Sequence, residues 1–478
     1  MALEFTKSIG TAAAVIAIGA CVHDRGMPAT PTLPVAYQAP TRSAAGVDTS
    51  VFAAFGSPEL DQLIQAAGRN NQDLASAVAR VEQAAARARQ AGAAVLPQVD
   101  ADLSATQYAG GSHGATAHET DWSALLSASY ELDFWGKNRA LRASARASAD
   151  ADRANLATAR TTVLTAVAAT YFKVQSLRER IALARLNLDT ANDLLKFIES
   201  RHAAGLIGPA DLAAQRAAVA NAELVIPQLE QQEAEALGTL AVLTGQAPEG
   251  FALTSRPLDT MAEPAVAAGM PAQLLQRRPD LMAAEYALRA AHADVIAARA
   301  ALFPSFNLTA SGGVANPAVQ AAVITLAGTG YSLTAGADVV QTLFDNGRRR
   351  AVTQEAAARE AGLLAAYRGA ILSALLDVET ALGEIQHLDS QQRAQRENVA
   401  QSELALKGAQ LRYREGATEV VAVLEAQRTL SAAREQRSEY QLARLNALLS
   451  LSKALGGSWQ TPTDAPLARV RAAGESSP

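Results

Sequence analysis

The sequence predicts a mostly helical protein built from two similar halves, each of which pairs long helices with two short strands of membrane-barrel character. The first observation is an internal repeat: residues 70–74 align with 277–281 at an offset of 207, and residues 201–205 align with 412–416 at an offset of 211. Solenoid repeats have periods of about 20–50 residues. The much longer period indicates a fused pair of like halves, suited to a pseudo-symmetric ring.

The second observation is a pair of very long helical stretches. From Lys137 to Ala204 there is neither glycine nor proline, and at ~1.5 Å per residue such a helix would be roughly 100 Å long. Apolar or small residues recur from Val163 to Ile198 at alternating spacings of four and three, which predicts a heptad seam. The equivalent stretch, 348–415, keeps the seam from Ile371 to Ile385 and then turns polar over 387–398.

Shorter helices are predicted over residues 58–94, 210–245, 271–301 and 419–455. Pro227 predicts a break in the second of these, because proline removes a backbone hydrogen bond and clashes with the preceding turn.

The third observation is strict alternation in two short runs per half. Apart from Leu125, one side of each run is polar, and the other side carries apolar residues with aromatic residues near several ends. The apolar sets are Val99, Ala101, Leu103 and Ala105; Trp122, Ala124, Leu126, Ala128, Tyr130, Leu132 and Phe134; Phe306, Leu308 and Ala310; and Tyr331, Leu333, Ala335, Ala337 and Val339. This pattern is typical of transmembrane β-barrel strands, although a water-soluble sheet with one wet face fits it equally well.

Four strands do not close a barrel, since closure needs about eight, and an open edge in lipid leaves backbone groups unsatisfied at several kcal/mol each. Strands in a membrane therefore require an oligomer. Three chains would form a twelve-stranded barrel with room for an aqueous pore.

Composition excludes several other classes of function. The net charge of −5 argues against nucleic-acid binding, which favours a basic face. The six histidines are scattered without metal-ligand spacing, and no phosphate-binding loop or nucleophile–base pair is present. We therefore expect no catalytic residue, no metal site and no cofactor, and we interpret the acidic pair Glu131 and Asp133 as pore lining.

The N-terminus predicts a lipoprotein. An uncharged, mostly apolar run from Ser8 to Ala20 precedes the only cysteine, Cys21; it is shorter than the roughly 20 residues of a membrane span and suits a signal peptide. The four residues ending at Cys21 resemble a bacterial lipobox, in which the cysteine is acylated. The n-region carries Lys7 but also Glu4, so the expected positive charge is absent.

Residues 268–304, which contain the stretch Arg277, Arg278, Pro279 and Asp280, resemble the outer-membrane channel proteins of tripartite efflux pumps, in the NodT/OprM lipoprotein branch of the TolC-like family. Residues 130–136 and 344–348 support this resemblance, which covers about residues 50–460. It implies a homotrimer whose twelve-stranded barrel in the outer membrane continues into a long periplasmic α-helical barrel.

The resemblance also implies partners and a function. The channel would be a passive exit duct for drugs or other toxic small molecules, joined by a periplasmic adaptor to an inner-membrane pump of the resistance-nodulation-division type. The alternatives are a type I secretion duct that exports proteins and a non-transporting periplasmic coiled-coil scaffold. The exported substrate is not specified by the sequence.

These interpretations together predict how the chain is divided into segments. The segments are a lipoprotein signal peptide (1–20), a lipid-anchored extended tether (21–57), a first efflux repeat (58–250), a linker (251–270), a second repeat (271–458) and a disordered tail (459–478).

The resemblance finally implies two sets of functional residues at the periplasmic end. Turns at Gly205–Leu206 and Gly416–Ala417 each follow a long helix and are expected to form the tip that contacts the adaptor, with glycine ending the helix in a left-handed conformation. The alternative is that these glycines only end the helices. Asp211 and Tyr413 are expected to restrain the closed aperture, with Arg412 adding an ionic contact. In relatives, an aspartate and a tyrosine at the same offsets from the glycines are hydrogen-bonded to each other. A simpler interpretation is that Asp211 caps the returning helix.

Overall fold

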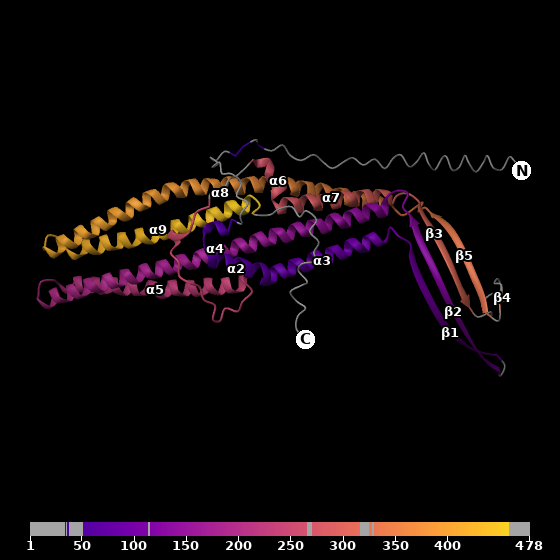
Figure 1. The fold of residues 1–478 in the computed structure, drawn as a ribbon, viewed down its shortest axis with the longest axis horizontal. Helices are drawn as coiled ribbons and strands as arrows, with labels where there is room; N and C mark the ends of the chain where they lie inside the picture. The colour runs from indigo at the N-terminus through magenta and orange to yellow at the C-terminus, as the bar shows by residue number, and fades with distance from the viewer. Residues whose placement is uncertain are drawn as a thin grey trace. The chain divides into compact units, whose positions relative to one another are not determined.

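The computed structural model describes residues 51–112, 115–264, 270–315, 325–326 and 329–457, together with Pro34, Ala36 and Tyr37. Cys21, the signal peptide, most of the tether and the tail lie outside the described residues. The main elements (Figure 1) are α2 (Pro58–Asn70), α3 (Gln72–Ala93), β1 (Gln98–Ser112), β2 (Ala115–Leu132), α4 (Lys137–Ala203), α5 (Pro209–Leu243), α7 (Pro279–Ala300), β3 (Ser305–Ala315), β4 (Thr325–Leu326), β5 (Thr329–Val340), α8 (Arg348–Arg414) and α9 (Val420–Ala454).

The two halves have helices of matching length, which confirms the internal repeat. Helices α4 and α8 each have 67 residues, α5 and α9 each have 35, and α3 and α7 each have 22. The long helices begin and end within one residue of the predicted stretches 137–204 and 348–415.

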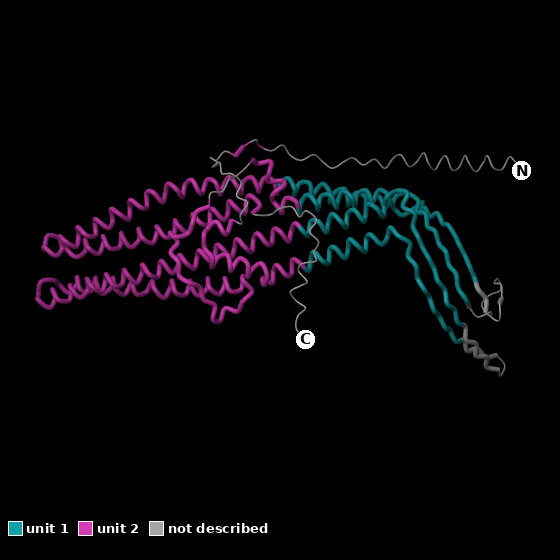
Figure 2. The backbone as a smooth tube through the Cα atoms, in the orientation of Figure 1, with its two compact units in different colours: residues 1–31, 79–153, 283–369 teal, residues 32–78, 154–282, 370–478 magenta. Residues whose placement is uncertain are grey.

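The chain divides into two compact units (Figure 2). Among the described residues, the first unit contains 79–153 and 283–369, and the second contains 51–78, 154–282 and 370–457. The helices α3, α4, α7 and α8 pass from one unit into the other.

The first unit holds an antiparallel sheet in the order β1-β2-β3-β5-β4. The two predicted strands of each half are present, but they are longer than predicted, with 15, 18, 11 and 12 residues in β1, β2, β3 and β5. Strand β4 adds two residues beside the end of β5. The observed register pairs Leu103 with Ala124, Tyr130 with Leu308, and Leu308 with Ala337. Because directly paired residues point to the same face, the predicted apolar sets of all four strands share one face.

Leu125 breaks the alternation by placing an apolar side chain on the polar face. It pairs there with Gly313 of β3. A Cβ built on Gly313 would lie 2.3 Å from the carbonyl oxygen of Ala124 and 3.1 Å from a methyl of Leu125. The absence of a side chain at Gly313 therefore lets the two strands and Leu125 pack closely.

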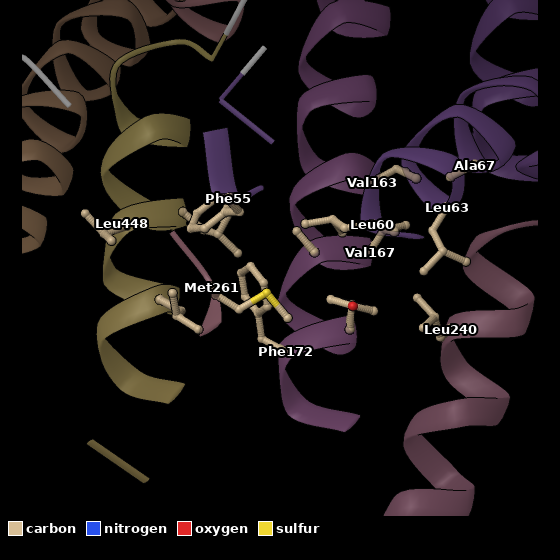
Figure 3. Packing of buried hydrophobic residues seen from close by; sticks show 14 of the residues in the cluster. Phe55, Leu60, Leu63, Ala67, Val163, Val167, Phe172, Leu240, Met261 and Leu448 are labelled. Atoms are coloured by element: carbon tan, nitrogen blue, oxygen red, sulfur yellow. The ribbon is translucent and has the colours of Figure 1, made fainter. Parts of the chain in front are cut away.

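The second unit contains the main hydrophobic core (Figure 3). Phe55, Leu60, Val167, Phe172 and Leu240 are among its fully buried residues, and they come from α2, α4, α5 and the short helix η2 (Ala53–Phe55). The rings of Phe55 and Phe172 meet edge to face at 5.0 Å. The predicted heptad seam of α4 is confirmed, since most of its positions from Val163 to Ile198 are buried.

The predicted helices 58–94 and 271–301 are each interrupted, contrary to expectation. Asn71 separates α2 from α3: its Oδ1 accepts from the Leu74 amide at 3.1 Å, and its Nδ2 donates to the Leu243 carbonyl at 2.9 Å. Arg278 follows the short helices η4 (Pro271–Gln273) and α6 (Leu274–Arg277) and precedes α7. The Asn71 side chain thus bonds the start of α3 and the end of α5 at once, and the Arg278 guanidinium donates to the Ala454 carbonyl at the end of α9 at 3.2 Å. Such bonds to unsatisfied helix ends favour the breaks over a continuous helix.

The break predicted at Pro227 is wrong, because α5 runs through it from Pro209 to Leu243. The proline removes only the bond to the carbonyl of Glu223. Both Pro227 and Glu223 are exposed, so water can satisfy the freed carbonyl and the helix continues.

The polar stretch 387–398 attaches α8 to α9. Gln395 is buried and donates to the Ala433 carbonyl at 2.7 Å, and Gln392 donates to the Tyr440 carbonyl at 3.3 Å. Asp389 pairs with the buried Arg444 of α9. Hydrogen bonds to helix carbonyls thus replace the apolar seam here.

Within the described residues, one helix, α8, contains an 18-residue stretch with a mean hydropathy of 1.4, of which 22% is buried. Length and composition alone are weak evidence of a membrane span, because packing helices of other proteins have the same properties.

Candidate functional site

The polar face of the sheet carries a row of hydrophilic side chains across three strands. The register places Glu131, Asn307 and Asp338 directly beside one another. Glu131 also accepts two bonds from the Lys137 ammonium, at 2.6 and 2.8 Å. Asp100 of β1 lies on the same face, opposite Ser127. The arrangement provides charge and hydrogen bonding toward water but holds no pair of groups poised for proton transfer.

Aromatic contacts fix the point where the strands become helices. The indole of Trp135 stacks on Phe303 with ring centroids 4.8 Å apart, and its Nε1 donates to the Pro304 carbonyl at 2.6 Å. Phe134 meets Phe306 edge to face at 4.9 Å and remains 62% exposed. Exposed aromatics at strand ends are typical of a membrane–water interface.

The two predicted tip turns have the same geometry. Gly205 and Gly416 are left-handed, with φ of 74° and 75°. The amides of Leu206 and Ala417 donate to the carbonyls of the residues five positions earlier, at 3.0 and 2.8 Å. This pattern is a Schellman motif, which satisfies the last carbonyls of a helix. The predicted left-handed glycines are therefore confirmed, and the two turns expose Leu206 and Ala417.

Tyr413 lies in a buried cluster close to the second turn. Its side chain is 5% exposed, and its ring meets Phe197 of α4 edge to face with centroids 5.7 Å apart. The guanidinium of Arg201 lies 5.3 Å from the Tyr413 ring and 5.9 Å from that of Phe197. The cluster therefore connects the ends of α4 and α8 within the second unit.

The residues predicted to restrain the aperture are only partly brought together. Among the described residues, the Tyr413 hydroxyl has no hydrogen-bond partner, so the expected bond to Asp211 is not formed within one chain. Asp211 lies in the first turn of α5, whose N-cap is Gly208, so it is not the capping residue. A carboxylate in a first turn is still favoured by the helix dipole. Arg412 is exposed.

The electrostatics of the cluster agree with this geometry. Burial raises the pKa of the Tyr413 phenol; the nearby Arg201 opposes the shift, whereas Asp211 reinforces it. The phenol is therefore neutral at physiological pH.

Sequence reasoning missed Arg201. The repeat aligns Arg201 with Arg412 at the offset of 211, which makes both arginines candidates. Only Arg201 has an aromatic residue four positions earlier, and residues four apart on a helix are neighbours. That spacing from Phe197 is the available signal for the stacked arginine.

The described residues contain no group of three or more histidine, cysteine, aspartate or glutamate side chains that could hold a metal ion. Nothing in the geometry assembled above supplies a nucleophile with a base.

Comparison with known proteins gives consistent matches along the chain. The sequence profile of the outer membrane efflux proteins matches residues 63–246 and 270–457. The pyoverdine export outer membrane protein OpmQ of Pseudomonas aeruginosa is 41% identical over 95% of this chain and 98% of its own length. Crystal structures of CusC give a TM-score of 0.81 at 28% identity, covering 91% of this chain and 99% of that one. The open state of the MtrE outer membrane channel of Neisseria gonorrhoeae gives 0.80 at 28% identity, covering 91% and 98%.

Proposed function

Since the chain belongs to the outer membrane efflux protein family, we propose that three copies of it assemble into one closed channel. The protein is a non-enzymatic outer membrane efflux channel that extends into the periplasm. The observation that carries the trimer is the open sheet. Among the described strands, β1 has no partner on its outer edge, and β5 is paired there only with the two residues of β4. Unpaired edges are costly in lipid, and three four-stranded sheets would close a barrel.

The exposed apolar face supports a lipid-facing sheet. Leu103 of β1 is 84% exposed and Leu333 of β5 is 83% exposed. Arginine on the lipid face of a barrel costs about 2–4 kcal/mol at the bilayer midplane, whereas changes on the pore face are tolerated. We therefore expect Leu103→Arg to reduce the amount of heat-modifiable oligomer in outer-membrane fractions. The adjacent Ser104→Arg, on the opposite face, is the matched control and should assemble normally.

The oligomer itself is tested by light scattering of the solubilised protein. A mass of three chains supports the proposal. A stable monomer or dimer contradicts it, provided that the same protein shows the β-sheet signal in outer-membrane vesicles.

The proposal includes a lipid anchor at Cys21, supported by the lipobox-like residues that precede it. Several acyl chains bind a membrane far more strongly than one. Mass spectrometry of the mature N-terminus should find a diacylglyceryl cysteine, and an unmodified Met1 or Ala2 terminus would contradict the lipid anchor. A Cys21→Ser protein that is exported should still insert through its barrel.

The channel would act as the passive outer component of a tripartite pump. A periplasmic adaptor would contact the turns at Gly205–Leu206 and Gly416–Ala417, and an inner-membrane resistance-nodulation-division pump would supply the energy. Replacing Gly205 or Gly416 with a bulky residue should abolish efflux while leaving trimer and localisation intact. Normal efflux in both variants would count against the adaptor contact.

The aperture would be restrained around Tyr413. Its buried, unpartnered hydroxyl and the influence of Asp211 on its pKa support a contact that completes only in the assembled channel. Charge-assisted hydrogen bonds contribute roughly 1.5–3 kcal/mol, so three symmetric copies would hold the pore mostly shut. Tyr413→Phe with Asp211→Ala should increase single-channel conductance in planar bilayers. Conductance unchanged from wild type would place the gate elsewhere; Arg412→Gln tests the expected ionic contact in the same assay.

The cargo would be a small molecule. OpmQ is named for the export of pyoverdine, so the first test is complementation of a strain that lacks its own pyoverdine channel. Restored secretion would assign this cargo, and its absence with normal trimer levels would exclude it. A type I protein duct is the second candidate, which export of a protein substrate alone would favour.

A further inference from the structure

A basic surface crosses three helices of the first unit. Four of its arginines lie at helical spacing on α4, and one each comes from α3 and α7. They line a groove of about 720 Å³ between α3 and α4 and one of about 430 Å³ between α4 and α7. The six residues are Arg89, Arg139, Arg142, Arg146, Arg153 and Arg289.

The outer members of this arginine surface are neutralised, whereas the central ones are not. Arg139 pairs with Asp133, Arg153 with Asp150 and Arg289 with Glu285. Within the part of the chain that the structure describes, Arg89, Arg142 and Arg146 have no ion pair or side-chain hydrogen bond. These three all line the groove between α3 and α4.

The three central arginines are brought together by a close helix contact. Gly92 of α3 lies against Arg142 of α4, such that a Cβ at Gly92 would be 3.7 Å from the Arg142 Nε. Arg142 and Arg146 are one helical turn apart, and like charges at this spacing destabilise a helix. The groove therefore concentrates positive charge that the local fold does not compensate.

The repeat indicates that these arginines are not required by the architecture. At the equivalent positions of the second half, Ile296 corresponds to Arg89, Thr353 to Arg142 and Ala357 to Arg146. Helices of the same lengths form there with no arginine at these three positions. A purely structural role for the arginines would be expected to recur in both halves.

We propose that the groove formed by Arg89, Arg142 and Arg146 is an anion-binding site for ligands with two or more phosphate or carboxylate groups. A guanidinium donates paired hydrogen bonds that match the geometry of both groups. Two sources could supply this chemistry: an anionic solute in transit, or an anionic lipid headgroup. The site goes beyond the proposed function, since a monomeric or non-transporting chain would bind the same probes.

The experiment uses the full-length protein in neutral detergent with tripolyphosphate as the soluble probe, followed by calorimetry. Arg142→Gln with Arg146→Gln should weaken binding at least tenfold, and Arg89→Gln alone should weaken it several-fold. The matched control is Arg359→Gln with Arg396→Gln, two exposed arginines of α8, which should stay within twofold of wild type. Raising the salt from 0.1 to 1 M should also weaken binding, because the Debye length falls from about 10 to about 3 Å.

A second arm distinguishes the source of the ligand. The same variants are placed in nanodiscs of mixed phosphatidylglycerol and phosphatidylcholine, and retained lipid is counted by mass spectrometry. Loss of tripolyphosphate binding in the groove variants, with equal lipid retention, assigns a solute. Loss of retained phosphatidylglycerol alone assigns a headgroup. The proposal is overturned if the groove variants and the control variants are indistinguishable in both arms while their unfolding temperatures are equal.

Discussion

Replacing Gly245 with alanine should destabilise the second unit far more than its left-handed backbone alone explains. Gly245 ends α5 with φ of 74°, and an alanine in this conformation costs roughly 1–2 kcal/mol. Its Cβ would lie 2.3 Å from the Asn70 carbonyl oxygen and 2.7 Å from the carbonyl carbon. Both neighbouring atoms are backbone, so no side chain can rotate away.

The added cost follows from what must move. Carbon atoms in favourable contact lie about 3.5–4.0 Å apart, so the end of α5 has to withdraw by roughly 1 Å from the junction of α2 and α3. That shift strains the bond of 2.9 Å from Asn71 to the Leu243 carbonyl and the packing of the fully buried Leu240. Overpacking typically costs about 1–3 kcal/mol and a lost hydrogen bond about 1 kcal/mol. We expect a total of about 3–6 kcal/mol.

Gly205→Ala is the matched control. Gly205 has the same φ of 74°, and a Cβ there would meet nothing within 4 Å, so only the backbone cost applies. Guanidinium unfolding of the solubilised protein, followed by helical circular dichroism, should separate the two variants by about 2–4 kcal/mol. Equal losses in both variants would refute the assignment of the cost to the close approach.

Three further predictions address other contacts. Burial opposes ionisation of Asp280, but the hydrogen bond and charge of Arg278 outweigh it and lower the pKa; the ion pair therefore stabilises the fold above about pH 4 and loses its effect as the pH falls through the lowered pKa. Acid titration of unfolding should show the advantage of wild type over Arg278→Asn shrinking below that pH, and a constant difference would contradict it. Gln215 is fully buried: its Nε2 donates to the Ala191 carbonyl at 2.6 Å, whereas its Oε1 has no partner. Gln215→Leu removes one hydrogen bond and one unsatisfied acceptor together, so stability in thermal melts should change by about 1 kcal/mol or less, and a loss above about 2 kcal/mol would count against this reasoning. Gly313→Ala should reduce the yield of assembled barrel in outer-membrane fractions, because the new Cβ meets the Ala124 carbonyl at 2.3 Å; wild-type yield would show that the strands can separate freely.

The sequence predicted the repeat, the long helices and the faces of the strands because each is encoded by a sustained pattern. The period-two alternation of residues 122–134 is a property of one run, and it holds wherever the partner strand lies. The breaks at Asn71 and Arg278 were missed because they depend on carbonyls of Leu243 and Ala454, far away in the chain. No local pattern reports such a contact.

The site was predicted less completely for the same reason. The left-handed turns follow from glycine after a helix, so Gly205 and Gly416 could be identified. Arg201 was missed: its spacing from Phe197 makes it a candidate, but its contact with the Tyr413 ring depends on how α4 and α8 pack. The helix break at Pro227 was wrongly predicted because the energetic cost of a proline inside a helix depends on whether the freed carbonyl reaches water. The exposure of Glu223, whose carbonyl is freed, depends on the tertiary structure.

The matching lengths of α4 with α8 and of α5 with α9 restrict how this channel can evolve. A residue inserted into one of these helices rotates everything beyond it by about 100° and turns its seam away from its neighbours. Only whole heptads keep the seam in phase, each adding roughly 10 Å. An insertion in α4 or α8 alone would also displace the turn that follows it, while the returning helix kept its length. Lengthening the duct to span a wider periplasm therefore requires four coordinated insertions, whereas loops between the elements can vary one at a time.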